Sequence, residues 1–342
     1  LRHKLGTHVS YAVFKADSTG EIDVATAKPI RGTYNGKAAW AAFRENEVSE
    51  QYVRKLFKIL NEMLIFFSHS LLDSSDGELA SVPIKKHWMH PALKRTEIEE
   101  DGFCGTLFKP PGDGPFPAVI DISGTGGGLH EHKGSMLASE GFVVLCVAFF
   151  QYKDLVDDLA DVEVEYFEVE FFLFSPLIIV PTIFTHNKEK LAGHLVYFVN
   201  KIAISNQSIR HTEYEKSAEI DYQRIPKSTS FRLVASMDDL VSPSVFWSRY
   251  MSERLKESGH EVEVDLVCGG HIMEPPYFPH HDKVYARFQG FCSGYGGEIV
   301  LHGKSQELSW ARTIEFFTRT LGQPAKMPEW NRLKHNEIKS NL

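Results

Sequence analysis

The sequence predicts an α/β fold for its larger, C-terminal part, with a mostly parallel sheet that helices cover on both faces. From about Thr96 onward, apolar runs of strand length alternate with helix-like stretches. Residues Phe142–Phe150 form a near-continuous apolar run, which is typical of a central strand. A shorter run, Pro117–Ser123, leads through a glycine-rich segment into a helix that Gly141 closes.

The N-terminal part predicts β structure between residues 9 and 36. Val9, Tyr11 and Val13 alternate with polar or small residues, Asp17–Gly20 supplies a turn, and Asn35-Gly36 is a hairpin signal. The next apolar stretch, residues 53–67, has helical spacing, and both a helix and a strand stay open for it.

Further elements of the C-terminal part follow in chain order. The sequence predicts an acidic amphipathic helix over Asp154–Glu170 and a strand over Arg232–Val234. A helix over Phe246–Leu255 that ends at Gly259 comes next, and an alternating strand over Val262–Leu266 follows it. The last predicted element is a helix over Trp310–Leu321 that Gly322 caps.

Composition excludes several classes of protein. The chain has 342 residues, is 43% hydrophobic and carries a net charge of −8, which argues against a nucleic-acid or anionic-membrane surface. Its four cysteines lie far apart without a C-x-x-C pair, so neither a zinc site nor a disulfide framework is expected, and a reducing intracellular compartment is favoured. The apolar run at residues 171–184 is too short for a membrane span, which needs about 20 residues.

The glycine-rich segment, residues 124–128, is typical of a loop that presents backbone N–H groups to an anion. A dinucleotide fingerprint is excluded because Leu129 stands where its last glycine belongs, and no Gly-Lys-Ser/Thr follows for a phosphate loop. An oxyanion loop and a plain tight turn both remain possible from the residues alone.

Two long runs resemble one family. They are His87–Leu129, HWMHPALKRTEIEEDGFCGTLFKPPGDGPFPAVIDISGTGGGL, and Cys268–Pro279, CGGHIMEPPYFP. Both resemble the acyl-CoA thioesterase and bile acid-CoA:amino acid N-acyltransferase family. The resemblance implies a truncated β-sandwich domain at residues 1–95, an α/β-hydrolase domain at 96–325 that is incomplete between about 169 and 208, and a tail at 326–342.

The resemblance also implies the site. Asp238 is the predicted acid, with Asp239 as runner-up, and His271 is the predicted base; an aspartate after one strand can orient a histidine after the next. Gly124, Gly126, Gly127 and Gly128 form the predicted oxyanion loop, with the N–H groups of Gly126 and Gly127 as donors. Without the resemblance, an exposed loop aspartate and a solvated histidine would be expected.

The nucleophile is missing from this pattern. A nucleophile elbow is a G-x-S-x-G turn that precedes the acid, yet Gly193 is the single glycine between Gly141 and Gly259. Its spacing would make Leu191 or Leu195 the nucleophile, and neither can attack a thioester.

Two other motifs are set aside. Gly290–Gly294 mimics a G-x-C-x-G elbow, but it follows the predicted base and is interpreted as a surface turn. His130-Glu131-His132 does not have metal-ligand spacing, and no metal is expected.

The predicted function is therefore hydrolysis of acyl-CoA thioesters through an acyl-enzyme, in a chain that lacks the nucleophile. The alternatives are a non-catalytic acyl-CoA-binding relative, a defective gene model in which intron sequence replaced the elbow exon, and an acyl-CoA:amino acid N-acyltransferase. Acyl-CoA is the expected partner, no cofactor is implied, and neither nucleic acid nor a membrane span is expected. The location is predicted to be cytoplasmic or peroxisomal, because Ser340-Asn341-Leu342 resembles a peroxisomal address.

Overall fold

In the computed structural model, the chain forms two compact units. The first unit contains residues 1–87, 196–209 and 221–312, and the second contains residues 88–195, 210–220 and 313–342. The structure describes residues 2–5, 8–23, 26–32, 64–72, 75, 77–100, 102–122, 124, 127–158, 161–162, 166, 185–186, 189–190, 197–199, 202–204, 221–276, 280–286 and 291–329.

The described strands and helices follow the chain in this order: β1 (Arg2–Leu5), β2 (His8–Val13), β3 (Arg31–Gly32), β4 (Leu64–Leu72), β5 (Glu78–His87), β6 (Lys94–Glu100), β7 (Phe103–Lys109), β8 (Ala118–Ile122), α2 (His132–Ser139), β9 (Val143–Ala148), β10 (Thr185–His186), β11 (Glu189–Lys190), β12 (Tyr197–Val199), β13 (Ile202–Ile204), β14 (Phe231–Ser236), α4 (Ser244–Glu257), β15 (Val262–Val267), β16 (Lys283–Ala286), β17 (Phe291–Gly294) and α5 (Ile299–Leu321). Sheets and helices mix in one chain, so the fold class is α/β. No helix in the described part of the chain is long and apolar enough to cross a membrane.

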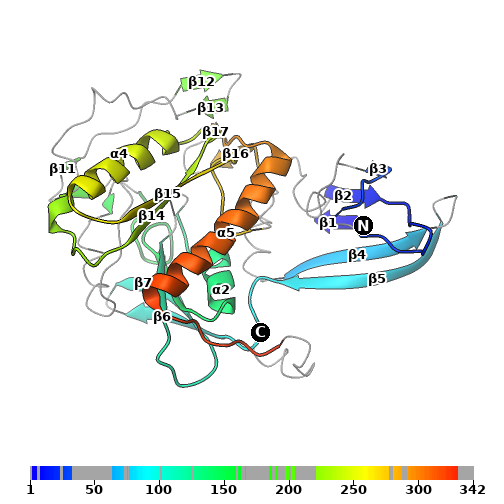
Figure 1. Cartoon of the computed structure of the whole chain (residues 1–342), viewed down its shortest axis with the longest axis horizontal. Coiled ribbons are helices and arrows are strands. Elements are labelled where there is room, and N and C mark those ends of the chain that lie inside the picture. The colour runs from blue at the N-terminus through cyan, green and yellow to red at the C-terminus, as the bar shows by residue number, and fades with distance from the viewer. Residues whose placement is uncertain are drawn as a thin grey trace. The chain divides into compact units, whose positions relative to one another are not determined.

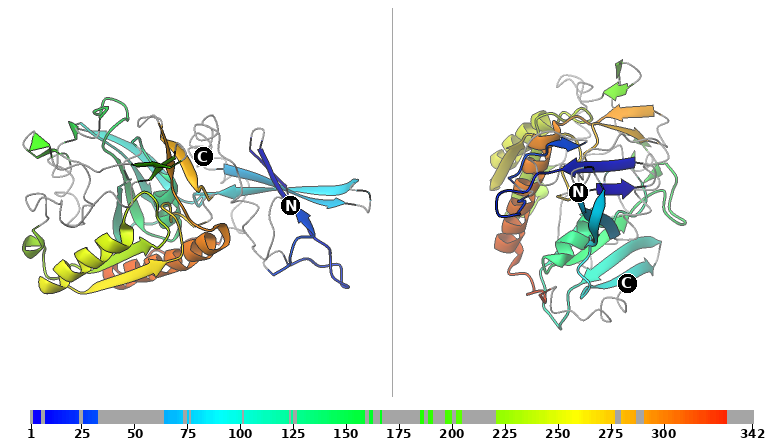
Figure 2. Two further views of the ribbon diagram at one scale, coloured as in Figure 1. Left: turned by 90° about the horizontal axis from the view of Figure 1, so that it is seen from above. Right: turned by 90° about the vertical axis from the view of Figure 1, so that its right-hand side faces the viewer.

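The N-terminal sheet of the first unit is antiparallel, with strand order β3-β2-β1-β4-β5. The strand predicted from the alternation of Val9, Tyr11 and Val13 is β2, and the predicted turn at Asp17 is present, since its carboxylate accepts the N–H of Thr19 at 2.8 Å. Figures 1 and 2 show β4 and β5 as a long hairpin. Residues 64–67 of the ambiguous stretch are therefore strand; its remainder and the Asn35-Gly36 signal lie outside the described residues.

The second unit is built on a mixed sheet with strand order β6-β7-β9-β8. β8 and β9 are parallel, whereas β6, β7 and β9 pair antiparallel, so the sheet is less parallel than the sequence predicts. The reason is a tight turn between β6 and β7. Asp101-Gly102 is a hairpin dipeptide, and Gly102 has a φ of +83°, which glycine adopts at little cost.

β9 is the central strand of this sheet, as its apolar run predicts. Phe103, Leu145 and Val147 form its buried core on one face, and Tyr166 packs against them. α2 packs against β9 and β7. Beyond α2, Gly141 turns the chain with a φ of +101° and its N–H donates to the Ala138 carbonyl at 2.9 Å, so the predicted helix end is confirmed.

The first unit also contains a parallel strand pair, β14 and β15, joined through α4. α4 packs against both strands and runs beside them in Figures 1 and 2. Arg232 of β14 and Arg312 of α5 both bind Asp265 of β15, at 2.6 and 2.7 Å, which ties the long helix to the strand pair. The strands and helices predicted here are confirmed, although α5 begins at Ile299, well before the predicted start.

Two predicted elements are wrong. Residues Asp154–Asp158 form turns rather than the start of a helix, because Gln151 and Lys153 have positive φ and the N–H of Gln151 donates to the Val156 carbonyl at 2.8 Å. Phe291–Gly294 is not a surface turn but the strand β17, which pairs with β16 on one side and β13 on the other.

Candidate active site

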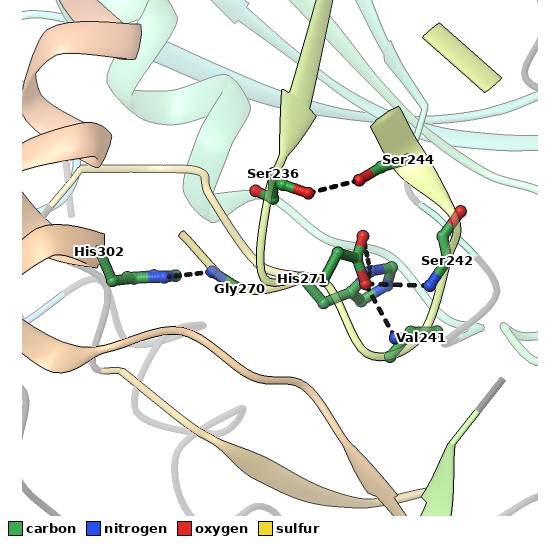
Figure 3. Close-up of polar contacts among 8 residues, drawn as sticks. Ser236, Val241, Ser242, Ser244, Gly270, His271 and His302 are labelled. Atoms are coloured by element: carbon green, nitrogen blue, oxygen red, sulfur yellow. Dashed lines mark hydrogen bonds and ion pairs between the residues drawn. The ribbon is translucent and has the colours of Figure 1, made fainter. Parts of the chain in front are cut away.

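The loop after β14 holds a buried carboxylate. The Asp239 side chain is only 5% exposed, and its Oδ1 accepts the N–H groups of Val241 at 2.8 Å and Ser242 at 2.9 Å. Such an Asx turn forms because a short carboxylate reaches its own backbone two and three residues on. Ser244 closes the base of the loop by donating its hydroxyl to the Ser236 carbonyl at 2.8 Å (Figure 3).

The loop after β15 brings a histidine to this carboxylate. Because β14 and β15 are parallel neighbours, their C-terminal loops emerge at the same edge. The Nδ1 atom of His271 lies 3.1 Å from each carboxylate oxygen of Asp239. Figure 3 shows the imidazole beside the turn of Val241 and Ser242.

This contact fixes the chemistry of the ring. A carboxylate only accepts, so Nδ1 carries the proton and the lone pair of neutral His271 resides on Nε2. Nε2 has no hydrogen-bond partner among the residues that the structure describes, and the side chain is 34% exposed. The ring can therefore take a proton from a group that approaches Nε2, while Asp239 stabilises the resulting imidazolium.

Asp238 is not the partner of His271, so the predicted contact is wrong, and Asp239, the runner-up, makes that contact instead. The Asp238 carboxylate instead accepts the Gly297 N–H at 2.9 Å, and Asp238 is exposed where Asp239 is buried. Neighbouring residues of a turn point their side chains in different directions, so only one of the two can reach the ring. The sequence holds no signal that separates the two, because both aspartates stand in the same turn between β14 and α4.

Tyr295, which sequence reasoning missed, contacts His271 twice. Its carbonyl accepts the His271 N–H at 2.8 Å, and its ring meets the imidazole edge-on, with centroids 5.0 Å apart at 76°. Burial raises the pKa of the Tyr295 phenol, and the negative charge of Asp239 adds to the effect, so the phenol stays protonated.

The predicted oxyanion loop lies in the second unit. Gly127 and Gly128 have φ values of +66° and +82°, so this loop needs glycine. The Gly128 N–H is already taken, because it donates to the Phe150 carbonyl at 2.8 Å. The Gly127 N–H has no acceptor among the described residues. Gly124 is exposed, and Gly126 is not among the residues that the structure describes.

The histidines after this loop are neutral and half-buried rather than arranged around a metal. Burial lowers the pKa of His130, whose Nε2 lies 2.7 Å from the Gly127 carbonyl oxygen. Burial, with the neighbouring His130 ring second, lowers the pKa of His132 to about 3. Glu131 between them pairs with Arg95 at 2.8 Å. Within the described ranges, no group of three or more histidine, cysteine, aspartate or glutamate side chains could hold a metal ion.

The segment expected to carry the nucleophile, residues 169–208, lies mostly outside the described residues. Cys292, the cysteine of the G-x-C-x-G decoy, lies within β17, and burial raises the pKa of its thiol. A raised pKa lowers the thiolate fraction, which is the reactive form of cysteine.

Comparison with known proteins gives two family matches and several relatives that align along most of the chain. Residues 162–323 match the model described as "BAAT / Acyl-CoA thioester hydrolase C terminal", and residues 1–100 match "Acyl-CoA thioester hydrolase/BAAT N-terminal region". The chain is 27% identical to acyl-coenzyme A thioesterase 6 of Homo sapiens over 373 positions, covering 91% of this chain and 86% of that protein. It is 27% identical to the peroxisomal succinyl-coenzyme A thioesterase of Mus musculus, covering 92% and 86%. It is 28% identical to acyl-coenzyme A amino acid N-acyltransferase 1 of Mus musculus, covering 92% and 88%.

Proposed function

The chain belongs to the acyl-CoA thioester hydrolase/BAAT family, and from that premise we propose that Asp239 and His271 are the acid and base of an acyl-CoA site that lacks its nucleophile. The observation that carries the proposal is the contact of His271 Nδ1 with both oxygens of a buried carboxylate, at 3.1 Å. A solvated surface histidine would have no such partner. The acid and base follow neighbouring strands in the order that an α/β-hydrolase domain requires.

The fold assignment is part of the proposal. Residues 96–325 are the proposed α/β-hydrolase domain, and residues 1–95 are the proposed β-sandwich domain. The parallel pair β14–β15 with its α4 crossover supports the first assignment, and the antiparallel sheet β3-β2-β1-β4-β5 supports the second.

The lack of a nucleophile rests on the sequence. Gly193 is the single glycine between Gly141 and Gly259, and leucines occupy both positions that its spacing would give the nucleophile. The alignment with the human relative is 373 positions long, whereas this chain has 342 residues, so that relative carries residues without a counterpart here. This length difference is consistent with the loss of a segment that contained the elbow.

Without the nucleophile, the site keeps one route to hydrolysis. His271 Nε2 takes a proton from water, the hydroxide oxygen attacks the thioester carbonyl carbon, and the carbon–sulfur bond breaks. The proton on His271 then goes to the departing coenzyme A thiolate. Triads of this kind that lose a member keep only about 10³–10⁴-fold catalysis over water, so turnover stays far below that of an enzyme with an intact triad.

The glycine loop is the proposed oxyanion loop, as the family resemblance implies. The N–H groups of Gly126 and Gly127 are the proposed donors, because the Gly128 N–H already serves the Phe150 carbonyl. The residue after a nucleophile normally supplies the other N–H, so the missing elbow weakens oxyanion stabilisation as well.

The test is thiol release from a long-chain acyl-CoA by the purified chain and by its His271→Ala variant. We expect a slow rate in the wild type that falls in the variant but stays above the buffer rate, because substrate binding and the oxyanion loop still act there. Turnover of several per second that vanishes in the variant would mean that a nucleophile is present. Equal rates in both proteins would mean that His271 is not the base.

One relative is named as peroxisomal, and on this basis we propose an intracellular location for the chain. A fluorescent fusion expressed in cultured cells tests the location. Fluorescence in the cytoplasm or in peroxisomes is expected, and export into the medium would contradict it.

A further inference from the structure

We propose that His302 is a positioning residue for His271, acting through the backbone N–H of Gly270. The inference rests on the proposed role of His271 as the base. It goes beyond that role, because it identifies a residue that keeps His271 in contact with Asp239.

The direct link is one buried hydrogen bond between two distant parts of the sequence. The Gly270 N–H donates to Nδ1 of His302 at 2.9 Å, and His302 is 3% exposed in the first turn of α5 (Figure 3). A donor N–H requires a lone pair on Nδ1, so the His302 ring is neutral with its proton on Nε2. Gly270 is the residue before the base, so this bond fixes the peptide that leads into His271.

The fit around this peptide leaves no freedom. A Cβ atom at Gly270 would lie 2.2 Å from the Gly296 carbonyl oxygen, and one at Gly296 would lie 2.0 Å from the Asp238 carbonyl oxygen. Neither distance is possible for real atoms, so glycine is required at both positions. Three loops therefore touch through their backbones: the acid loop after β14, the base loop after β15, and the loop between β17 and α5.

The same third loop makes further contacts to both others. Tyr295 accepts the N–H of His271 at 2.8 Å, so two successive N–H groups of the base loop end on residues 295–302. The Asp238 carboxylate accepts the Gly297 N–H at 2.9 Å, which ties the acid loop to the same segment. His280 contacts the same segment. Its Nε2 lies 3.1 Å from the Gly296 carbonyl oxygen, and its ring centroid lies 4.8 Å from that of His302.

Through this arrangement, the hydrogen bond to His302 controls the distance between His271 and Asp239. The bonds from His271 Nδ1 to Asp239 are 3.1 Å long, near the upper end of the hydrogen-bond range. A shift of the base loop by about 0.5–1 Å would break them, because functional side chains tolerate only about 0.5 Å of displacement. Loss of the acceptor at His302 also leaves the Gly270 N–H buried without a partner, which drives such a shift.

The matched variants are His302→Asn and His302→Leu. The amide oxygen of asparagine can take the place of Nδ1 and keeps the acceptor, whereas leucine fills similar volume without one. The readout is the NMR spectrum of ¹⁵N-histidine-labelled protein. There the Nδ1 proton of His271, bonded to Asp239, gives a downfield resonance that His271→Ala identifies by its loss.

We expect the resonance in the wild type and in His302→Asn, and its loss in His302→Leu with an unchanged near-ultraviolet circular dichroism spectrum. A folded His302→Leu protein that keeps the resonance would overturn the proposal. If His302→Leu does not fold, His302→Gln replaces it, because its oxygen lies one bond further out and should not restore the resonance; retention there would equally overturn the proposal. The readout needs no turnover, so a failed assay for thioester hydrolysis leaves this result interpretable.

Discussion

The acid–base loops and the glycine loop all follow β-strands, yet they are held in different ways. The loops of Asp239 and His271 are fixed by side chains: a carboxylate that binds two backbone N–H groups, and an imidazole that binds the carboxylate. The glycine loop is fixed by its backbone, through the bond from the Gly128 N–H to the Phe150 carbonyl and through positive φ at Gly127 and Gly128.

The difference shows which of the proposed functional loops depend on single side chains. In the acid–base loops, one substitution removes several hydrogen bonds at once. In the glycine loop, the N–H groups belong to the backbone, and the positive φ of Gly127 and Gly128 restricts these two positions to glycine.

The largest effect is expected for Asp239→Ala compared with Asp238→Ala. Removal of the Asp239 carboxylate leaves the buried N–H groups of Val241 and Ser242 without their acceptor, which costs about 3 kcal/mol of unfolding free energy. The exposed Asp238 carboxylate has one backbone bond, and its loss costs about 1 kcal/mol. Urea unfolding of both variants measures the difference; a larger loss in Asp238→Ala would contradict the geometry.

A second comparison uses two glycines with ordinary backbone conformations, one from each loop. Gly270→Ala places a methyl group against the backbone of Gly296 and should cost about 2–3 kcal/mol. Gly124→Ala meets no atom within 4 Å and should change the unfolding free energy by less than about 0.5 kcal/mol. Thermal unfolding of the two variants distinguishes these outcomes, and equal midpoints would refute the tight contact at Gly270.

The pH dependence of stability is expected to come partly from the histidines beside the glycine loop. Burial lowers the pKa of His132 from 6.5 to about 3 in the folded chain, while the unfolded chain keeps the ordinary value. Between pH 6.5 and pH 3 the unfolded state thus binds a proton that the folded state does not. This stability is complete above pH 6.5 and falls by up to about 1.4 kcal/mol per pH unit as the solution is acidified.

The His132→Gln variant removes this titration while keeping a polar side chain. Its unfolding free energy should fall less steeply than that of the wild type between pH 6.5 and pH 5. Urea unfolding at several pH values measures both slopes. Identical slopes would show that His132 is not buried in its neutral form.

The smallest expected difference is in how fast the individual cysteines react with an alkylating reagent. Cys268 is exposed, whereas Cys104 and Cys146 are buried, and burial raises the pKa of Cys292. Iodoacetamide should therefore modify Cys268 first in the native chain, and mass spectrometry of peptides reads the order. Preferential modification of Cys292 would instead show a reactive thiol in β17.

Much of the fold was predictable because apolar periodicity and glycine positions report it directly. β9 is a continuous apolar run, β15 alternates, and Gly141 and Gly322 close helices with positive φ. The antiparallel pairing of β6 and β7 also had a signal, Asp101-Gly102, because that dipeptide favours a two-residue hairpin over a crossover.

The candidate site was predictable to within one residue. His271 lies where the Gly-Gly-His run predicts, but the choice between Asp238 and Asp239 depends on which side of a turn each side chain takes. No periodicity in the sequence decides that orientation. The acidic stretch from Asp154 was misleading because Gln151 and Lys153, which have positive φ, turn the chain just before it.

The central claim, that the acid–base pair survives without a nucleophile, is tested most directly by looking for the covalent intermediate. The purified chain is mixed with excess long-chain acyl-CoA, quenched in acid at short times and weighed intact by mass spectrometry, with His271→Ala beside it. The account predicts an unchanged mass in both proteins at every time. A mass increase of one acyl group that appears in the wild type, maps to one side chain and is absent from His271→Ala would contradict it.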